Sequence, residues 1–535
     1  MAYATWLLLT TVLLAGYATQ FFHGSASPNE DAAMLMRYAE NFGQGHGIVW
    51  NVGQAPVDGA TDFLFMVLVG SMVRLGLHVE SATRAVSLLA HGLTLVILSI
   101  VFFQQEMPAW LAGATILFIG IGGGLFYAEA FFGTPLFALL ALSAWIAALH
   151  LRDHPEDRRA AWLFGLLSLL TGLARPEGVF LCGFMWLAIV WWHRERLDGI
   201  ARLSAVYLGA MIGPGGVYFL WHWRYFGYPL PNPYYVKGRG IYGTSLVESV
   251  QSAAEMTWPF VLGLIPSLQL RQGRRHAIFL AIPVVGFACL WVLLSDEMNY
   301  FARFQYALVP MVAVSWYPSL RAFLRHRGWT ERIQDPQRLA TDSLPLLVAA
   351  CALLALASQY RSFAARIERH ADGRQEIGAA LRKYQLENYV LAVAEAGLMP
   401  LYSGWASVDA WGLNDSHISH DGLSDEYLDR FKPAIVMYHA NKSPVAPTQR
   451  PSGREYALRW AHMVDQLDAY VQKRPYRLAA AFGVEAHEAH YYFVREDLAD
   501  AKELYDLIAK FRYTWPATGE VAKNLAVKRT DTAGR

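Results

Sequence analysis

The sequence predicts a polytopic α-helical membrane protein that carries a C-terminal extracytoplasmic α/β domain. Of its 535 residues, 54% are hydrophobic and only 17% are charged, whereas an ordinary soluble domain carries about 25% charged residues. Long apolar runs fill the chain up to residue 358, and none follows. From residue 359 onward the charges are mixed, and helix patterns alternate with strand-like runs. We therefore predict a transmembrane domain over 1–358 and a soluble domain over 359–535.

The apolar runs predict membrane crossings, since a helix needs about 20 residues to cross about 30 Å of hydrocarbon. Arginines cluster in the loops near 152–159, 194–202, 271–275 and 321–338. By the positive-inside rule these loops are cytoplasmic. The predicted crossings lie near 3–22, 84–103, 109–126, 134–150, 160–175, 178–193, 203–223, 257–270, 277–295, 306–324 and 343–358.

The run 62–77 decides the topology. It is short and contains Arg74, and as a full crossing it would put the loop 25–62 on the opposite side from the other external turns. We therefore predict that it lies in the outer interface as a juxtamembrane helix. This leaves about eleven crossings, with the N-terminus inside and the C-terminus outside. Because no basic residue precedes the first run, we expect it to be a retained anchor.

The soluble part is predicted to form one small α/β domain. Helix patterns lie at 375–384, 424–431, 454–473 and 499–511, and strand-like runs lie at 389–393, 434–438, 476–482 and 490–494. The polar tail beyond about residue 518 is expected to fray. The three cysteines fall in apolar runs, so no disulfide framework is expected. A net charge of +1 argues against a nucleic-acid partner, which would require a basic surface.

The loop 25–62 carries the first candidate site residues. Glu30 and Asp31 directly follow the first apolar run, and an amphipathic helix pattern and a Gly/Asn-rich loop come after them. One interpretation is structural, because Asn29 as N-cap and two acids in the first turn would complement the helix dipole. The other is catalytic, because a carboxylate at the membrane face can act as a general base.

Unusual polar residues collect at the same predicted face of the membrane. Glu129 lies before a Thr-Pro helix start, and Arg175 with Glu177 interrupts two apolar runs. Arg303 lies before the run 306–324. Their structural alternatives are a helix cap, an interfacial ion pair and snorkelling to the headgroups. Because a charge buried in a membrane costs about 2.5–3.5 kcal/mol, their convergence on the side of Asp31 favours a functional role.

The loop 225–257 is rich in Gly, Pro and Tyr, and it contains Asn232, Tyr234, Tyr235 and Lys237. Aromatic faces beside a cation suit a sugar that is joined to a phosphate. An ordinary surface loop is the structural alternative.

The motifs of the membrane part resemble those of the GT-C glycosyltransferases, most closely the branch that contains the mycobacterial terminal arabinofuranosyltransferase. The first loop has an acidic pair, then R-x-A-x-N-x-x-x-G-x-G-x-V-x-N-x-G, then V-D-G-A-T at 57–61. The stretches L-A-R-P-E-G at 173–178, F-F-G-T-P-L-F at 131–137 and P-N-P-Y-Y-V-K at 231–237 are also similar to family motifs, although the second departs from the family pattern at Phe132 and Gly133. The family often has Asp-Asp where this chain has Glu30 and Asp31, which leaves Asp31 as the better candidate base.

The resemblance implies an inverting transfer of a sugar from a polyprenyl-phosphate donor, on the outer face of the bacterial cytoplasmic (inner) membrane. Asp31 is the predicted general base, and Glu30 is predicted to orient it or to bind the sugar. The predicted phosphate-binding residues are Arg303, Arg175, Lys237 and Arg37. The predicted substrate-binding residues are Glu129, Glu177, Asp58, Asn232, Tyr234 and Tyr235. The resemblance favours a pentofuranose such as arabinofuranose, whereas hexose or aminoarabinose donors serve other GT-C branches. The acceptor is expected to be a cell-envelope glycan, a lipid or a surface protein.

No cofactor is required by these motifs. Oxygen ligands from Glu30, Asp31, Asp296 and Glu297 would suit a divalent cation. The segment 487–490 has its histidines three residues apart and lacks the spacing of the HExxH zinc motif. No nucleotide-binding glycine motif lies at a strand-to-helix junction, so direct use of a nucleotide sugar is not expected.

Two other functions fit parts of the pattern. A flippase for lipid-linked sugars would also use membrane-embedded charges and a polyprenyl site. It needs no base for an acceptor, however, and it would place polar residues through the depth of the membrane instead of near one face. A membrane-anchored binding protein would not need about eleven crossings. The sequence therefore favours a glycosyltransferase.

Overall fold

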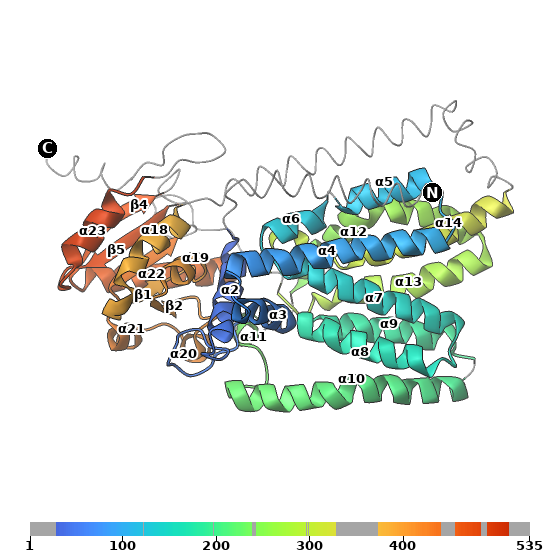
Figure 1. The fold of residues 1–535 in the computed structure, drawn as a ribbon, viewed down its shortest axis with the longest axis horizontal. Helices are drawn as coiled ribbons and strands as arrows, with labels where there is room; N and C mark the ends of the chain where they lie inside the picture. Colours follow the sequence, from blue (N-terminus) through green and yellow to red (C-terminus); the bar gives the residue numbers. More distant parts are fainter. Residues whose placement is uncertain are drawn as a thin grey trace, which may run out of the picture.

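The chain folds into a bundle of long helices with a small α/β domain at one end (Figure 1). The structure is a computed structural model that describes residues 28–120, 122–195, 197–237, 242–295, 297, 299–327, 373–439, 455–482 and 489–512. The predicted crossings at 3–22 and 343–358 lie outside the described residues. The predicted domain boundary at residue 358 does too, so the bounds of the two domains stay a prediction.

The bundle helices run side by side along the long axis of the molecule (Figure 1). They are α4 (Val79–Gln104), α5 (Ala109–Gly120), α6 (Gly123–Glu129), α7 (Thr134–Asp153), α8 (Arg158–Ala174), α9 (Gly178–Trp192), α10 (Leu197–Phe226), α12 (Gly243–Leu264), α13 (Arg271–Leu290) and α14 (Leu308–His326). The short 3₁₀ helix η1 (Ile265–Gln269) joins α12 to α13.

Several of these helices suit a membrane. Within the described residues, five stretches are long and apolar enough to cross one, namely Val79–Gln104, Ala109–Glu129, Thr134–Asp153, Ile200–Phe226 and Arg271–Leu290. On α10, the side chains of Ile212, Val217 and Leu220 are exposed, as expected for a surface that faces lipid. The predicted class, a polytopic helical membrane protein, is confirmed.

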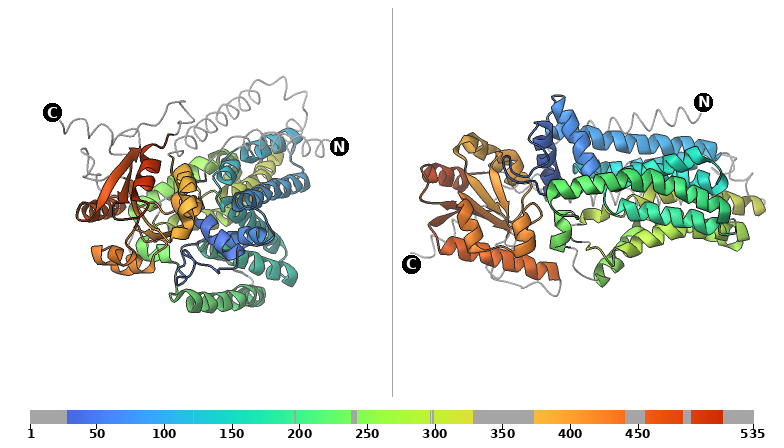
Figure 2. Two further views of the ribbon diagram at one scale, coloured as in Figure 1. Left: turned by 60° about the vertical axis from the view of Figure 1, so that its left-hand side comes forward. Right: turned by 90° about the horizontal axis from the view of Figure 1, so that it is seen from below.

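Two helices lie at the end of the bundle, one within the first loop and one directly after it. Helix α2 (Glu30–Gly43) lies crosswise between the bundle and the α/β domain (Figure 2), and α3 (Phe63–Arg74) packs against α2 and α4. Asn29 caps α2, since its Oδ1 accepts a hydrogen bond from Asp31 N at 3.1 Å. The twelve residues of α3 span about 18 Å, which is too short for a crossing of about 30 Å. This length fits the predicted juxtamembrane helix.

The α/β domain is built on one five-stranded sheet with the order β2-β1-β3-β5-β4. The strands are β1 (Val390–Val393), β2 (Ala406–Asp409), β3 (Ile435–His439), β4 (Tyr476–Phe482) and β5 (His490–Arg495). β1 runs parallel to β2 and β3, whereas β5 runs antiparallel to β3 and β4. The carboxyl ends of β1 and β3 and the beginning of β5 therefore meet at one edge of the sheet.

Helices cover this sheet. They are α18 (Arg374–Leu381), η3 (Arg382–Glu387), α19 (Leu398–Ser403), α20 (Ser416–Asp421), α21 (Asp425–Phe431), α22 (Glu455–Gln472) and α23 (Ala501–Ala509). Every predicted helix and strand of the domain is present. β2, α19 and α20 were not predicted, because segments of four to six residues are too short to show a period.

Candidate active site

Asp31 and Arg303 form a buried ion pair where the first loop meets the turn before α14. Arg303 Nη2 donates to Asp31 Oδ2 at 2.6 Å. The two side chains are only 9% and 13% exposed. Asp31 lies in the first turn of α2, and its partner Arg303 lies 272 positions further along the chain. The fold thus joins the predicted base to the first of the predicted phosphate-binding cations.

The backbone that leads into Arg303 is strained. Phe301 has a φ of 59° and Ala302 a φ of 58°, in a region that residues with a side chain rarely adopt. Tyr127 Oη donates to the carbonyl oxygen of Phe301 at 2.6 Å and helps to hold this turn. Such strain costs about 1–3 kcal/mol per residue and concentrates at functional sites. The guanidinium of Arg303 also lies 4.2 Å from the ring centre of Phe132.

Arg175 forms a second buried cluster beside this pair. Its Nε donates to Glu177 Oε1 at 2.6 Å, and its Nη1 lies 3.4 Å from Asp62 Oδ1. The ring of Phe304 lies between the two arginines, 4.6 Å from the guanidinium of Arg175 and 5.2 Å from that of Arg303. Burial raises the pKa of Asp62, although the charge of Arg175 acts in the opposite direction. The two clusters therefore form one continuous charged patch.

Glu30 is held by the α/β domain. Its carboxylate accepts hydrogen bonds from the backbone N of Gly397 and, at 3.3 Å, from Leu398 N, and its Oε2 lies 3.0 Å from Arg374 Nη1. A side chain on Gly397 would block this approach, because a Cβ there would lie 2.0 Å from the carbonyl oxygen of Glu30. Both carboxylate oxygens are thus used to dock the two parts. A direct role in sugar binding does not fit these contacts, whereas a role in positioning Asp31 does.

Glu129 ends α6 and is 3% exposed. Within the described part of the chain, neither of its carboxylate oxygens accepts a hydrogen bond. The predicted structural alternative, a helix cap, does not fit, because a negative charge at the C-terminal end of a helix opposes the macrodipole. A buried carboxylate is costly unless a polar group satisfies it. Glu129 therefore remains a candidate for binding a polar ligand.

Asp58 and Lys237, two further predicted site residues, have different electrostatic neighbours. Asp58 Oδ2 lies 2.7 Å from His222 Nε2, and burial raises the pKa of Asp58 while His222 partly offsets the rise. Burial lowers the pKa of Lys237, which ends α11 (Asn232–Lys237), and the charge of Asp31 is among those that oppose the change. Lys237 thus belongs to the electrostatic surroundings of Asp31, whereas His222 occupies the carboxylate of Asp58.

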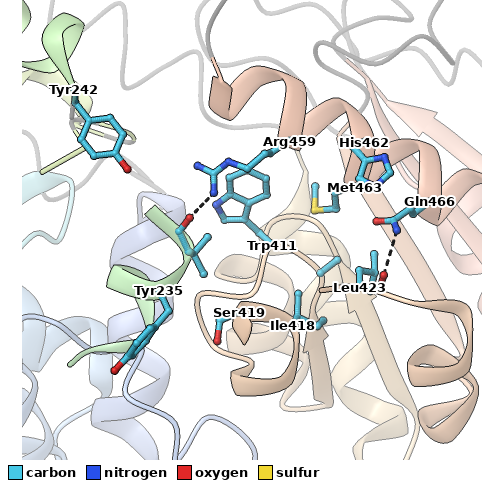
Figure 3. Close-up of a pocket in the computed structure, with 12 residues that line it drawn as sticks. Tyr235, Tyr242, Trp411, Ile418, Ser419, Leu423, Arg459, His462, Met463 and Gln466 are labelled. Atoms are coloured by element: carbon cyan, nitrogen blue, oxygen red, sulfur yellow. Dashed lines mark hydrogen bonds between the residues drawn. The ribbon is translucent and has the colours of Figure 1, made fainter. Parts of the chain in front are cut away.

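A cavity of about 360 Å³ lies between α11 and the α/β domain (Figure 3). Tyr235 and Tyr242 line it from the membrane part, and Trp411 and Arg459 line it from the α/β domain. Arg459 Nη2 lies 3.3 Å from Glu297 Oε2, and the same side chain donates to Val236 O. The remaining lining residues are Val236, Ala410, Ile418, Ser419, Leu423, His462, Met463 and Gln466. Aromatic faces with a few convergent polar groups are typical of sites for small ligands.

The predicted sugar-binding residues of this loop separate in the structure. Tyr235 lines the cavity, whereas Tyr234 is 40% exposed and is not among the lining residues. Asn232 Nδ2 donates to Gly412 O at 2.7 Å and to Leu413 O at 3.0 Å. These bonds tie α11 to the loop after β2. The predicted role of Asn232 in substrate binding therefore does not fit, because its amide group is engaged in holding the cavity wall.

The loop after β2 is organised by a buried acid. Asp409 Oδ1 accepts hydrogen bonds from the backbone N of Trp411 and Gly412, and its Oδ2 accepts from the backbone and side-chain N of Asn414. Burial raises the pKa of Asp409 to about 6, although these hydrogen bonds counteract the rise. The segment 409–415 thus shapes the wall that carries Trp411.

Arg37 is a structural residue in this fold. Its Nε donates to Trp50 O at 2.8 Å, and its Nη2 donates to Trp405 O at 2.8 Å. It also donates to Pro400 O and to Asn51 Oδ1. The prediction that Arg37 binds the donor phosphate does not fit, because its donors are engaged by the first loop and the α/β domain.

We expect Arg37→Ala to destabilise the protein. The substitution leaves buried carbonyl groups without a donor, and we expect the free energy of unfolding to fall on the order of 3 kcal/mol. The measurement is the midpoint of thermal unfolding, with Arg74→Ala in α3 as a control, because Arg74 is exposed. Unchanged stability together with lost binding of polyprenyl phosphate would restore the phosphate-binding role.

The predicted cation site of four acids does not form within the described residues. Glu30 pairs with Arg374, Asp31 with Arg303, and Glu297 with Arg459. The fourth acid, Asp296, lies outside the described residues, as do residues 487 and 488 of the segment 487–490. Each of the three described acids thus pairs with an arginine.

The arrangement of the helices and the domain is similar to that of ArnT from Cupriavidus metallidurans. The apo structure matches with a TM-score of 0.51 and 13% identity, covering 90% of this chain and 97% of that chain. The structure of ArnT bound to undecaprenyl phosphate matches with a TM-score of 0.53 and 12% identity over the same shares. The chain has the GT-C fold. Residues 359–518 match the model of a domain of unknown function, DUF8728. No curated protein matches the sequence significantly.

These similarities confirm the predicted fold and leave the finer prediction open. At 12% and 13% identity they show the fold alone, and membership of the arabinofuranosyltransferase branch is not shown by them. That assignment stays a prediction.

Three residues of the site were not predicted from the sequence. Asp62 carries a usable signal, since it is a charged residue at the very start of the apolar run 62–77. Arg374 and Arg459 carry none, because they lie among the mixed charges of the α/β domain and meet Glu30 and Glu297 only through the tertiary fold.

Proposed function

We propose that the protein is an inverting glycosyltransferase that moves a sugar from a polyprenyl-phosphate donor to an acceptor hydroxyl, on the outer face of the bacterial cytoplasmic membrane. The observation that carries the proposal is the buried Asp31–Arg303 pair, 2.6 Å apart, at the junction of the bundle and the α/β domain. A protein of the same fold binds undecaprenyl phosphate, which supports a lipid donor of this class.

The proposed chemistry is a single displacement. The acceptor oxygen attacks the anomeric carbon, and the bond from that carbon to the phosphate oxygen breaks. The acceptor proton passes to Asp31, a role typically worth about 10²–10⁴ in rate. Polyprenyl phosphate leaves with the bonding electron pair, and Arg303 stabilises the developing charge, supported by Arg175 and Lys237. Because one displacement occurs, the anomeric centre inverts.

The resting ion pair supports an order of events. While Arg303 donates to Asp31, the carboxylate oxygen Oδ2 is engaged. A guanidinium binds phosphate with the same fork geometry that it offers to a carboxylate, so the donor phosphate competes for Arg303. Donor binding would then free Asp31 to take the proton of the acceptor.

The cavity between α11 and the α/β domain is the proposed acceptor site. Trp411 and Tyr235 offer aromatic faces, and the Nε of Arg459, which has no hydrogen-bond partner within the described residues, offers a donor (Figure 3). This combination suits a hydroxyl-rich acceptor such as a glycan. The cavity also explains why an α/β domain is docked on the catalytic loop, since it completes the site.

We expect Trp411→Ala to raise the KM for the acceptor about tenfold, which corresponds to about 1.4 kcal/mol of lost binding. The KM for the lipid donor should not change, because Trp411 is not among the residues proposed to bind the donor phosphate. The measurement is steady-state transfer with each substrate varied in turn. Leu458→Ala is the control, because Leu458 is 54% exposed on α22 and does not line the cavity. An unchanged acceptor KM would contradict the assignment.

The sugar is proposed to be a pentofuranose such as arabinofuranose, on the sequence resemblance alone. The experiment that tests the function is transfer by the purified protein with a panel of short-chain polyprenyl-phosphate sugars and simple alkyl glycoside acceptors. Product from one donor, with the inverted anomeric configuration, would support the transferase. The alternative, a flippase for lipid-linked sugars, predicts no product and movement of the lipid across a bilayer.

A further inference from the structure

A second group of side chains, outside the Asp31–Arg303 site, converges at one edge of the sheet. Glu395 lies two residues beyond the end of β1, His439 is the last residue of β3, and His490 is the first residue of β5. His439 and His490 face each other in the strand register. Because β1 and β3 are parallel and β5 is antiparallel to them, the topology itself brings these three positions together.

The polar atoms of the three side chains lie close together. His490 Nε2 lies 2.6 Å from Glu395 Oε2, and His439 Nδ1 lies 3.6 Å from Glu395 Oε1. One ligand atom from each residue can be chosen so that all lie within 4.8 Å of one another. The two imidazole rings are stacked, with centres 4.3 Å apart and planes inclined by 16°. Their geometry directs two ring nitrogens toward one carboxylate.

We propose that Glu395, His439 and His490 bind a divalent transition-metal ion, with Zn²⁺ as the ion of best fit. Two imidazoles and one carboxylate are a ligand set that Zn²⁺ prefers, with bonds of about 2.0–2.2 Å. In a tetrahedral site of that size, ligand atoms are about 3.3 Å apart. The separations of 2.6 and 3.6 Å lie on either side of this value. Small side-chain rotations therefore suffice, and the fourth position stays open.

The burial of the group suits such a site. The side chain of His490 is 6% exposed, whereas those of Glu395 and His439 are 18% and 20% exposed. The sheet thus fixes the buried ligand His490, and the more exposed Glu395 and His439 leave a path for the ion to enter. Strands β3 and β5 hold the imidazoles in register, so the site does not depend on a flexible loop for two of its three ligands.

The proposed metal site lies next to a contact between the α/β domain and α2. Arg374 Nη1 lies 2.6 Å from Glu395 Oε2 and 3.0 Å from Glu30 Oε2. Arg374 is thus shared between two carboxylates, so its charge does not cancel that of Glu395 alone. An ion that fixes Glu395 would also fix Arg374 and, through it, the first turn of α2. The proposal itself concerns metal binding and does not rest on the transferase function.

The test is the metal content of the full-length, tag-free protein, because a polyhistidine tag would itself bind Zn²⁺. The detergent-purified protein is treated with a chelator, loaded with Zn²⁺ alone, desalted and analysed by mass spectrometry of the metal. We expect about one Zn²⁺ per chain, and its loss in both His439→Gln and His490→Gln. His417→Gln is the matched control, because His417 Nδ1 also lies beside a carboxylate, 3.1 Å from Asp421 Oδ2, on the surface of the same domain.

Each outcome decides the proposal. Retention of Zn²⁺ by the wild type and by His417→Gln, but not by the two site variants, supports it. No retained Zn²⁺ in the wild type, or equal retention in all variants, overturns it and leaves the group as a network of ion pairs. Should a site variant fail to fold, the visible spectrum of the Co²⁺-loaded wild type decides. Tetrahedral Co²⁺ absorption supports the site, and only the weak absorption of hydrated Co²⁺ overturns it.

Discussion

Asp31→Asn is expected to lower the rate of sugar transfer by about 10²–10⁴-fold, because it removes the group that takes the acceptor proton. The amide retains an oxygen that can accept the hydrogen bond from Arg303, which lies 2.6 Å from Asp31 Oδ2 in the wild type. The protein should therefore stay folded and should still bind the lipid donor. The measurement pairs single-turnover transfer with equilibrium binding of polyprenyl phosphate.

Glu40→Gln is the matched control for this variant. Glu40 lies on the same helix nine residues later, which at 100° per residue places it on the opposite side of α2. Its substitution should leave transfer within about twofold of the wild type, since uncoupled surface changes rarely disturb a site. Transfer by Asp31→Asn at the same rate as the wild type would show that another group is the base.

Arg303→Gln is expected to weaken the binding of undecaprenyl phosphate and to lower kcat/KM by about 10²–10³-fold. The reason is that the leaving phosphate gains charge in the transition state, and a positioned cation stabilises that charge. Arg303→Lys should recover part of the loss, because lysine keeps the charge but not the planar fork. The measurement is donor titration with both variants.

Arg321→Gln is the control for the Arg303 variants. Arg321 lies on α14, the helix that follows Arg303, and it pairs with Glu106, away from the Asp31 cluster. It should bind undecaprenyl phosphate as the wild type does. Unchanged lipid binding by Arg303→Gln would contradict the proposed contact with phosphate and would shift that role to Arg175 or Lys237.

The sequence predicts the helices and strands well where a period is long enough to read. The bundle helices and the helices α18, α21, α22 and α23 follow from apolar periodicity and charge. The short juxtamembrane helix α3 follows from topology, since the run 62–77 could not be a crossing without separating the external turns. Segments such as β2 and α19 could not be predicted, because four to six residues carry no period and depend on tertiary packing.

The site is predictable only in part. Asp31, Arg175, Glu177 and Arg303 stand out because charges beside apolar runs are costly, and the structure brings all four into one patch. Arg37 stands out in the same way, although it serves to dock the α/β domain.

The ligand-binding roles predicted for Arg37, Glu30 and Asn232 do not fit the structure for one shared reason. Sequence patterning shows that a polar group is unusual, but not which group satisfies it. That depends on contacts across hundreds of residues, as with Arg37 and Pro400, which are 363 positions apart. The cavity beside Trp411 and the cluster at Glu395 arise in the same way, from segments that meet only in the folded chain.

The most direct test of the central claim is a comparison of wild type and Asp31→Asn in two assays with the same lipid-linked sugar. One assay measures transfer to an alkyl glycoside in detergent, and the other measures lipid movement in proteoliposomes. We expect transfer by the wild type, its loss in the variant and continued binding of the donor by both proteins. No transfer by either protein, with lipid movement that survives Asp31→Asn, would contradict it and would favour a flippase.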